Sequence, residues 1–93
     1  SRKTVELMTS NHTGNLFQLP GTGWGLGFAV VKDGAATLTP ASTGLFYWSG
    51  ANNTHFFIDP KEKLIAIFMT QESNHNFDHH LALRQMVYQS IAD

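Results

Sequence analysis

The chain contains no cysteine, which excludes a disulfide framework, a thiolate zinc site and a cysteine nucleophile. Charged residues are also scarce, at 14%, and the six Lys and Arg are spread along the sequence instead of gathering in one segment. With a formal net charge of −1, the sequence lacks the basic patch that binds nucleic acid, so we expect no nucleic-acid partner. The missing cysteines leave the cellular compartment open.

Long apolar runs are missing as well. The strongest one, Leu64 to Met69, is far shorter than the ~20 residues of a membrane-spanning helix, so we expect no membrane segment. The sequence starts without an initiator Met or a signal-peptide core, and we expect it to continue a longer protein. A length of 93 residues is typical of one small domain, so residues 1–93 are predicted to form a single domain.

Two common serine-nucleophile motifs are absent. The sequence has no Gly-x-Ser-x-Gly elbow and no Ser-x-x-Lys, in which a lysine one helical turn away takes the serine proton. None of the serines meets either pattern: Ser1, Ser10, Ser42, Ser49, Ser73 and Ser90. If the chain belongs to an acyl-transfer enzyme, the attacking group lies elsewhere.

Hydrophobic periodicity predicts a helix at each end of the chain and strands between them. Helical spacing covers 1–10 and 77–92, with Ser1 and Asp78 as N-caps. Strands are predicted at 23–31, 46–50, 54–59 and 64–71, and a loop at 35–43. No connection between strands can hold a helix, so the fold class is α+β: an antiparallel sheet of about four strands with both terminal helices packed on one face.

Two patterns that could bind a ligand are incomplete. The glycines from Gly21 to Gly27 alternate but never reach Gly-x-Gly-x-x-Gly spacing, so they are not expected to hold a phosphate. His75 and His79 would lie one helical turn apart, as in zinc helices, but no third ligand is specified and Asp78 already serves as a cap. We therefore expect no metal and no cofactor.

Tyr47-Trp48-Ser49-Gly50-Ala51, followed by the segment 54–71, resembles the C-terminal segment of the serine β-lactamase and penicillin-binding-protein superfamily. The likeness is to its class C-like branch and the related carboxylesterases. It covers nearly the whole chain, including the strand 23–28 and the closing helix. In that family a Lys-Thr-Gly triad, or a Trp-x-Gly substitute, lies on the strand that edges the active site.

The resemblance assigns roles to four residues. It implies that Trp48, Ser49 and Gly50 bind the acyl side of a small substrate, and that the backbone amide of Ala51 is one of two oxyanion-hole donors. The lack of side chains at Gly50 and Ala51 would let a carbonyl reach the backbone. Trp48 replaces the charged lysine of the family, which favours uncharged esters over anionic β-lactams. Without the resemblance, the same residues read as an ordinary strand with a bulge.

Because Ser-x-x-Lys is missing, we expect the chain to be a C-terminal fragment of a serine hydrolase of esters or amides, inactive alone. Its partner would be the remainder of the hydrolase, or a second copy bound through the 46–50 edge. The alternative is a non-catalytic α+β binding or interaction module on the same scaffold. An exposed apolar patch opposite the helices would favour the fragment.

Overall fold

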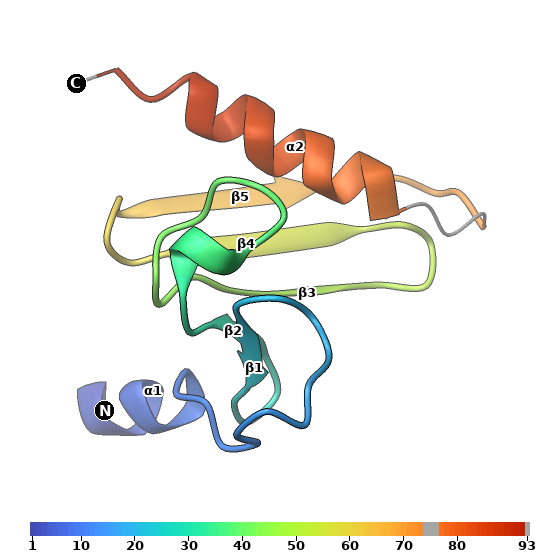
Figure 1. Ribbon diagram of the computed structural model, residues 1–93. Helices are drawn as coiled ribbons and strands as arrows, with labels where there is room; N and C mark the ends of the chain where they lie inside the picture. Colours follow the sequence, from blue (N-terminus) through green and yellow to red (C-terminus); the bar gives the residue numbers. More distant parts are fainter. Residues whose placement is uncertain (74–76, 93) are drawn as a thin grey trace.

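The computed structural model describes residues 1–73 and 77–92 and has an α+β fold (Figure 1). Its elements follow in this order: α1 (Arg2–Met8), β1 (Thr22–Trp24), β2 (Ala29–Val31), the short 3-10 helix η1 (Gly34–Ala36), β3 (Phe46–Ser49), β4 (His55–Asp59), β5 (Leu64–Phe68) and α2 (Phe77–Gln89). The predicted fold class is confirmed, with five antiparallel strands instead of about four.

The sheet is a meander in which each strand pairs with its neighbours in the sequence, in the spatial order β1-β2-β3-β4-β5. In the register of the three longer strands, Tyr47 lies opposite Phe57, and Phe57 lies opposite Ala66. Residues directly opposite one another share a face, so these three point to the same side of the sheet. Their sequence neighbours point to the other side.

The predicted strand 23–31 is in fact a hairpin of two short strands. Trp24 pairs with Ala29, and the Gly25 amide donates to the Phe28 carbonyl at 2.8 Å, which closes the turn. Gly27 has a φ of +96°, a conformation that glycine adopts without strain. Leu26 therefore lies in the turn with 47% of its surface exposed, and not on the apolar face of a strand. The alternation of large and small residues came from turn glycines.

The core lies between the sheet and α2. Val31, Leu45 and Phe57 are buried, and Leu83 and Val87 of α2 pack against them. Tyr88 of α2 stacks on Phe57 and donates its hydroxyl to the buried carboxylate of Asp59. Burial by itself would raise the pKa of Asp59, but hydrogen bonds from Tyr88, Ser42 and the 61–62 backbone outweigh it and lower that pKa.

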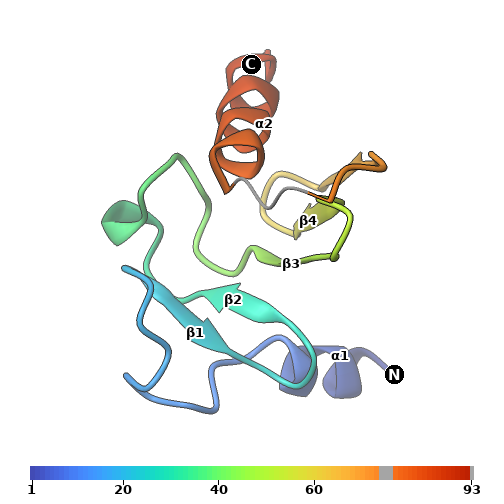
Figure 2. The same ribbon diagram turned by 90° about the vertical axis from the view of Figure 1, so that its right-hand side faces the viewer.

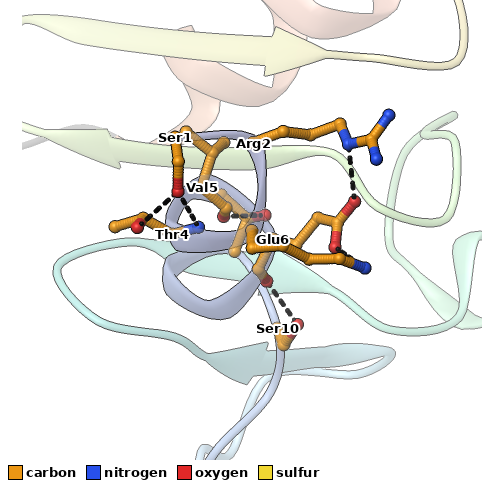
Figure 3. A network of polar contacts seen from close by, with 8 residues as sticks. Ser1, Arg2, Thr4, Val5, Glu6 and Ser10 are labelled. Atoms are coloured by element: carbon orange, nitrogen blue, oxygen red, sulfur yellow. Dashed lines mark hydrogen bonds and ion pairs between the residues drawn. The ribbon is translucent and has the colours of Figure 1, made fainter.

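α1 is a short surface helix fixed mainly by its ends. Ser1 is the N-cap, as predicted. Its hydroxyl accepts a hydrogen bond from the Thr4 amide at 3.3 Å (Figure 3). At the other end, the Met8 carbonyl accepts from the Leu26 amide in the β1–β2 turn at 2.9 Å. The ion pairs that Glu6 forms with the exposed side chains of Arg2 and Lys3 contribute little to stability.

The two helices lie on opposite sides of the sheet, not on one face as expected (Figures 1 and 2). Val5 of α1 lies beside Phe46 and Ile58, whose side chains point away from α2. Periodicity shows that a helix has an apolar stripe, but it does not show which side of a sheet the stripe covers. In the described part of the chain, neither helix is long and apolar enough to cross a membrane.

α2 covers most of the predicted segment 77–92. It begins at Phe77 and ends at Gln89. The predicted capping role of Asp78 depends on a side chain that lies outside the described residues, as does the whole of His75. The segments 54–59 and 64–71, which were predicted as strands, contain β4 and β5, and these form an antiparallel hairpin that turns across 60–63, where Lys63 has a φ of 56°.

Candidate functional site

The predicted site begins at the C-terminal end of β3. β3 pairs with β4 at four positions, but with β2 only at Phe46 and Tyr47. Thus β3 is the central strand of the sheet and not an edge strand, which corrects the expectation for 46–50. Trp48 and Ser49 nevertheless extend beyond the end of β2. Their backbone has no strand partner on that side within the described residues.

Trp48 forms an aromatic wall on the face of the sheet that points away from α2. Its indole is 45% exposed and meets the Trp24 ring edge-on, with centroids 4.7 Å apart. Trp24 in turn stacks on Phe17 at 5.8 Å. These contacts fix the plane of Trp48 while leaving almost half of its surface available to a ligand.

A tight turn follows Ser49 and contains Gly50. The Gly50 amide donates to the Thr54 carbonyl at 2.9 Å, and the Gly50 carbonyl accepts from the Asn53 amide at 3.2 Å. A side chain at position 50 would clash with the Thr54 hydroxyl. The turn therefore requires glycine because of its own packing. The resemblance had instead explained the missing side chain at Gly50 by the approach of a substrate.

The backbone amide of Ala51 is at the tip of this turn. Ala51 is exposed, and no acceptor for its N–H is found among residues 1–73 and 77–92. The amides of Gly50 and Asn53, in contrast, are both used inside the turn. The geometry thus leaves the Ala51 N–H free to donate to a ligand atom.

A pocket of about 380 Å³ brings Trp48, Ser49 and Gly50 together, and Ala51 follows directly in the chain. This volume is within the range of small-molecule sites. The other residues that line the pocket are apolar or uncharged at neutral pH: Thr54, His55, Phe56, Ile67, Phe68 and Met69. Because no Asp, Glu, Lys or Arg lines it, the pocket suits an uncharged group.

Behind the pocket lies a polar cluster of Ser49, His55 and His80, which was not predicted from the sequence. Ser49 Oγ lies 2.8 Å from His55 Nδ1 and 3.3 Å from His80 Nδ1, and the two imidazoles stack with centroids 4.4 Å apart. His80 Nε2 lies 3.4 Å from the Asn53 carbonyl oxygen. Both histidines are buried between the sheet and α2. The cluster therefore connects the end of β3 and its turn to α2.

One proton arrangement satisfies all three hydrogen bonds with both imidazoles neutral. His80 Nε2–H donates to the Asn53 carbonyl, which leaves His80 Nδ1 to accept from the Ser49 hydroxyl. Ser49 Oγ then accepts from His55 Nδ1–H. In this arrangement Ser49 is held on both sides, and its side chain fixes the strand end that precedes Gly50.

Of the two histidines beside Ser49, His55 is poorly suited to act as a general base. A general base becomes positively charged in the transition state. Burial, together with the charges of His80 and Arg84, lowers the pKa of His55 from 6.5 to about 4, so this imidazole accepts a proton poorly. His55 is therefore better suited to holding the Ser49 side chain than to taking its proton.

Part of this cluster has a sequence signal. In β4, the alternation of residues 55, 57 and 59 places His55 and Asp59 on the same buried face as Phe57. Polar residues at buried strand positions require partners, which the alternation alone could have indicated. The partner His80 comes from α2, and only the tertiary fold brings it to His55.

Asn53 has two further roles. Its φ of 66° lies in the left-handed region, which asparagine tolerates better than most residues, and its side chain is 1% exposed. Asn53 Nδ2 lies 3.2 Å from Nδ1 of His79, one of the residues considered for zinc. In the described part of the chain, no three His, Asp or Glu side chains converge as metal ligands do.

Comparison with known protein families gave no match to this chain, and comparison with curated proteins gave none either.

Proposed function

We propose that this chain is the C-terminal part of a serine hydrolase of the β-lactamase and penicillin-binding-protein type. In this proposal Trp48, Ser49 and Gly50 bind the acyl side of the substrate, and the Ala51 amide donates to the oxyanion. The nucleophile belongs to a segment outside these residues. The substrate is a small uncharged ester or amide, in keeping with the uncharged lining of the pocket.

One observation supports this proposal above the others. The Ala51 N–H has no acceptor among the described residues, while the turn that carries it is anchored by Gly50, Asn53 and Ser49. Oxyanion stabilisation needs a donor that is both free and fixed, because the protein then does not have to reorganise as charge develops. The two central amides of a four-residue turn, here Ala51 and Asn52, are left unpaired by the turn itself, and the place of Ala51 directly after Trp48, Ser49 and Gly50 selects it as the donor.

The exposed face of the sheet also supports a fragment over a self-sufficient module. On the side away from α2, Ile65 and Ile67 are 65% and 68% exposed, and Ile67 lines the same pocket as the exposed Trp48. Apolar side chains gathered in this way on one face are typical of a surface that packs against another part of the protein. A self-sufficient module that binds no other protein would have no reason to leave this face uncovered.

The experiment is fragment complementation. The chain is co-expressed with the segment encoded upstream of it, and hydrolysis of a nitrophenyl ester is measured for each part and for the pair. We expect no burst and no turnover from the chain alone, since an oxyanion donor contributes roughly 10²- to 10³-fold only when a nucleophile attacks. The pair should turn over the ester, and activity should depend on a serine in the upstream segment.

Two results would contradict this function. The first is turnover by the isolated chain that disappears when one of its own serines is replaced. The second is an upstream segment without a Ser-x-x-Lys motif, or a correctly assembled pair that does not hydrolyse esters or a chromogenic cephalosporin.

A further inference from the structure

Arg84 of α2 is a buried cation. Only 7% of its surface is exposed, and its guanidinium carbon lies 5.2 Å from the centre of the Tyr47 ring. The Nε and Nη1 atoms are inaccessible to solvent and have no hydrogen-bond acceptor among the described residues. A buried charge with unpaired donors costs several kcal/mol unless something compensates for it.

No carboxylate whose side chain the structure describes supplies this compensation. In residues 1–73 and 79–92 the ion pairs are those of Arg2 and Lys3 with Glu6, on α1 at the other side of the sheet. The buried carboxylate of Asp59 accepts from the Tyr88 hydroxyl and the Glu62 amide instead. Burial raises the pKa of Tyr47, so this phenol is neutral near pH 7 and offers a ring but no counter-charge.

A small cavity adjoins this cation. It has a volume of about 50 Å³ and is lined by Arg84 and Tyr47 together with Thr22 and Thr37. Apolar residues complete the lining: Leu19, Pro20, Leu38 and Leu81. The lining thus places one full positive charge in a cavity without an acidic residue, and the Thr22 and Thr37 hydroxyls donate to backbone carbonyl oxygens.

From these observations we propose that the cavity between α2 and the β1–β3 side of the sheet binds a small inorganic anion of halide size, held by Arg84. An anion supplies the counter-charge that the described residues do not provide, and it accepts from guanidinium N–H groups. The volume of about 50 Å³ fits one halide ion or one to two water molecules, since one water molecule takes about 30 Å³ in the liquid. A nucleotide or a polyphosphate is too large.

This site is separate from the proposed ester site. The cavity shares no lining residue with the pocket beside Trp48, and its ligand is charged whereas that pocket is uncharged. The inference therefore does not depend on the proposed hydrolase function. Its role would be to stabilise the packing of α2 on the sheet, because the anion would join Arg84 to residues that precede and form β1.

The test uses bromide as the probe. Thermal unfolding of the 93-residue chain is followed in sodium bromide and in sodium gluconate at equal ionic strength, since gluconate is too large for the cavity. We expect the unfolding midpoint to keep rising with the logarithm of the bromide concentration, and to be higher by roughly 4 to 8 °C at about five times the dissociation constant in a domain of this size. Arg84→Met keeps an unbranched side chain without the charge, and it should lose the bromide dependence. Arg2→Met, which removes an exposed arginine, should keep it.

Diffraction gives a second readout that does not depend on whether the Arg84 variant folds. Crystals of the unchanged chain grown in bromide should show an anomalous peak within hydrogen-bonding distance of the guanidinium. A cavity that shows no anomalous peak, and therefore holds water only, would overturn the proposal. So would a bromide effect of equal size in Arg84→Met and the unchanged chain, or no bromide effect in the unchanged chain.

Discussion

At the scale of single residues, the hydroxyl of Ser49 lies between two imidazoles, and this position decides what the residue can do. Hydrogen bonds on both sides hold the side chain, and burial lowers the pKa of His55 to about 4, so that this imidazole is a poor proton acceptor. A serine fixed in this way orients the backbone that follows it. The free Ala51 amide is thus positioned by contacts that reach from β3 to α2.

His55 should make stability depend on pH. Its pKa is about 4 in the folded chain and 6.5 in the unfolded chain, so the unfolded state binds more protons between these values. Folding stability is therefore complete above pH 6.5 and falls as the pH drops towards 4, by about 3 kcal/mol in total. Urea unfolding at a series of pH values measures this loss directly.

A matched pair of variants isolates the contribution of this residue. His55→Gln should flatten the pH dependence of the free energy of unfolding between pH 6.5 and 4, whatever its stability at pH 7. Gln18→Asn, which changes an exposed uncharged side chain, should leave the slope unchanged. An NMR titration of His55 with a midpoint near 6.5 would show that its surroundings do not disfavour the charge.

At the scale of elements, α1 and the β1–β2 hairpin depend on each other. A side chain at Gly25 would overlap the carbonyl oxygen of Met8, and that oxygen accepts from the Leu26 amide. The hairpin turn can therefore dock the end of α1 only because position 25 has no side chain.

We predict that Gly25→Ala loosens α1. The new Cβ would overlap the backbone carbonyl of Met8, which cannot rotate away as a side chain can. Removing the overlap therefore requires α1 to shift, at a cost of about 1 to 3 kcal/mol. Thermal unfolding should show the loss, and hydrogen exchange should rise in α1 before it rises in β4. Gly14→Asn is the control, because nothing lies within 4 Å of a side chain at position 14 and asparagine tolerates its φ of +57°. Equal stability of the two variants would contradict this account.

Elements with a clear local signal could be predicted from the sequence, and elements decided by tertiary contacts could not. The segments of β3, β4 and β5, and the Ser1 cap, follow from alternation and side-chain chemistry. The division of 23–31 into two strands depends on the docking of α1 onto Gly25. The central position of β3 depends on β2 pairing beside it, which alternation within β3 does not encode.

The candidate site divides in the same way. Trp48, Ser49 and Gly50 were proposed from a sequence motif, and the structure brings them to one pocket. The reason for Gly50 was different, since the Thr54 hydroxyl occupies the space beside it. His80 and Arg84 could not be assigned, because both are on α2 and acquire their partners only when α2 packs on the sheet.

At the scale of the whole molecule, the sheet has one face covered by α2 and another with exposed apolar side chains. The proposed ester pocket opens beside these side chains, among them Trp48, Ile67 and Met69. A segment that packed there would both bury the apolar face and lie next to Trp48, Ser49 and Gly50, which line the pocket. We therefore expect the nucleophile to come from the part of the proposed hydrolase that covers this face.

The most direct measurement compares Ala51→Pro with Ala51→Gly in the complemented hydrolase. Proline removes the N–H and glycine keeps it, so thermal unfolding checks that both variants fold and ester turnover then reports the donor alone. The account predicts that kcat falls roughly 10²- to 10³-fold in Ala51→Pro and stays within a few-fold of the unchanged chain in Ala51→Gly. Equal kcat values for the two folded variants would contradict the proposal that the Ala51 amide stabilises the oxyanion.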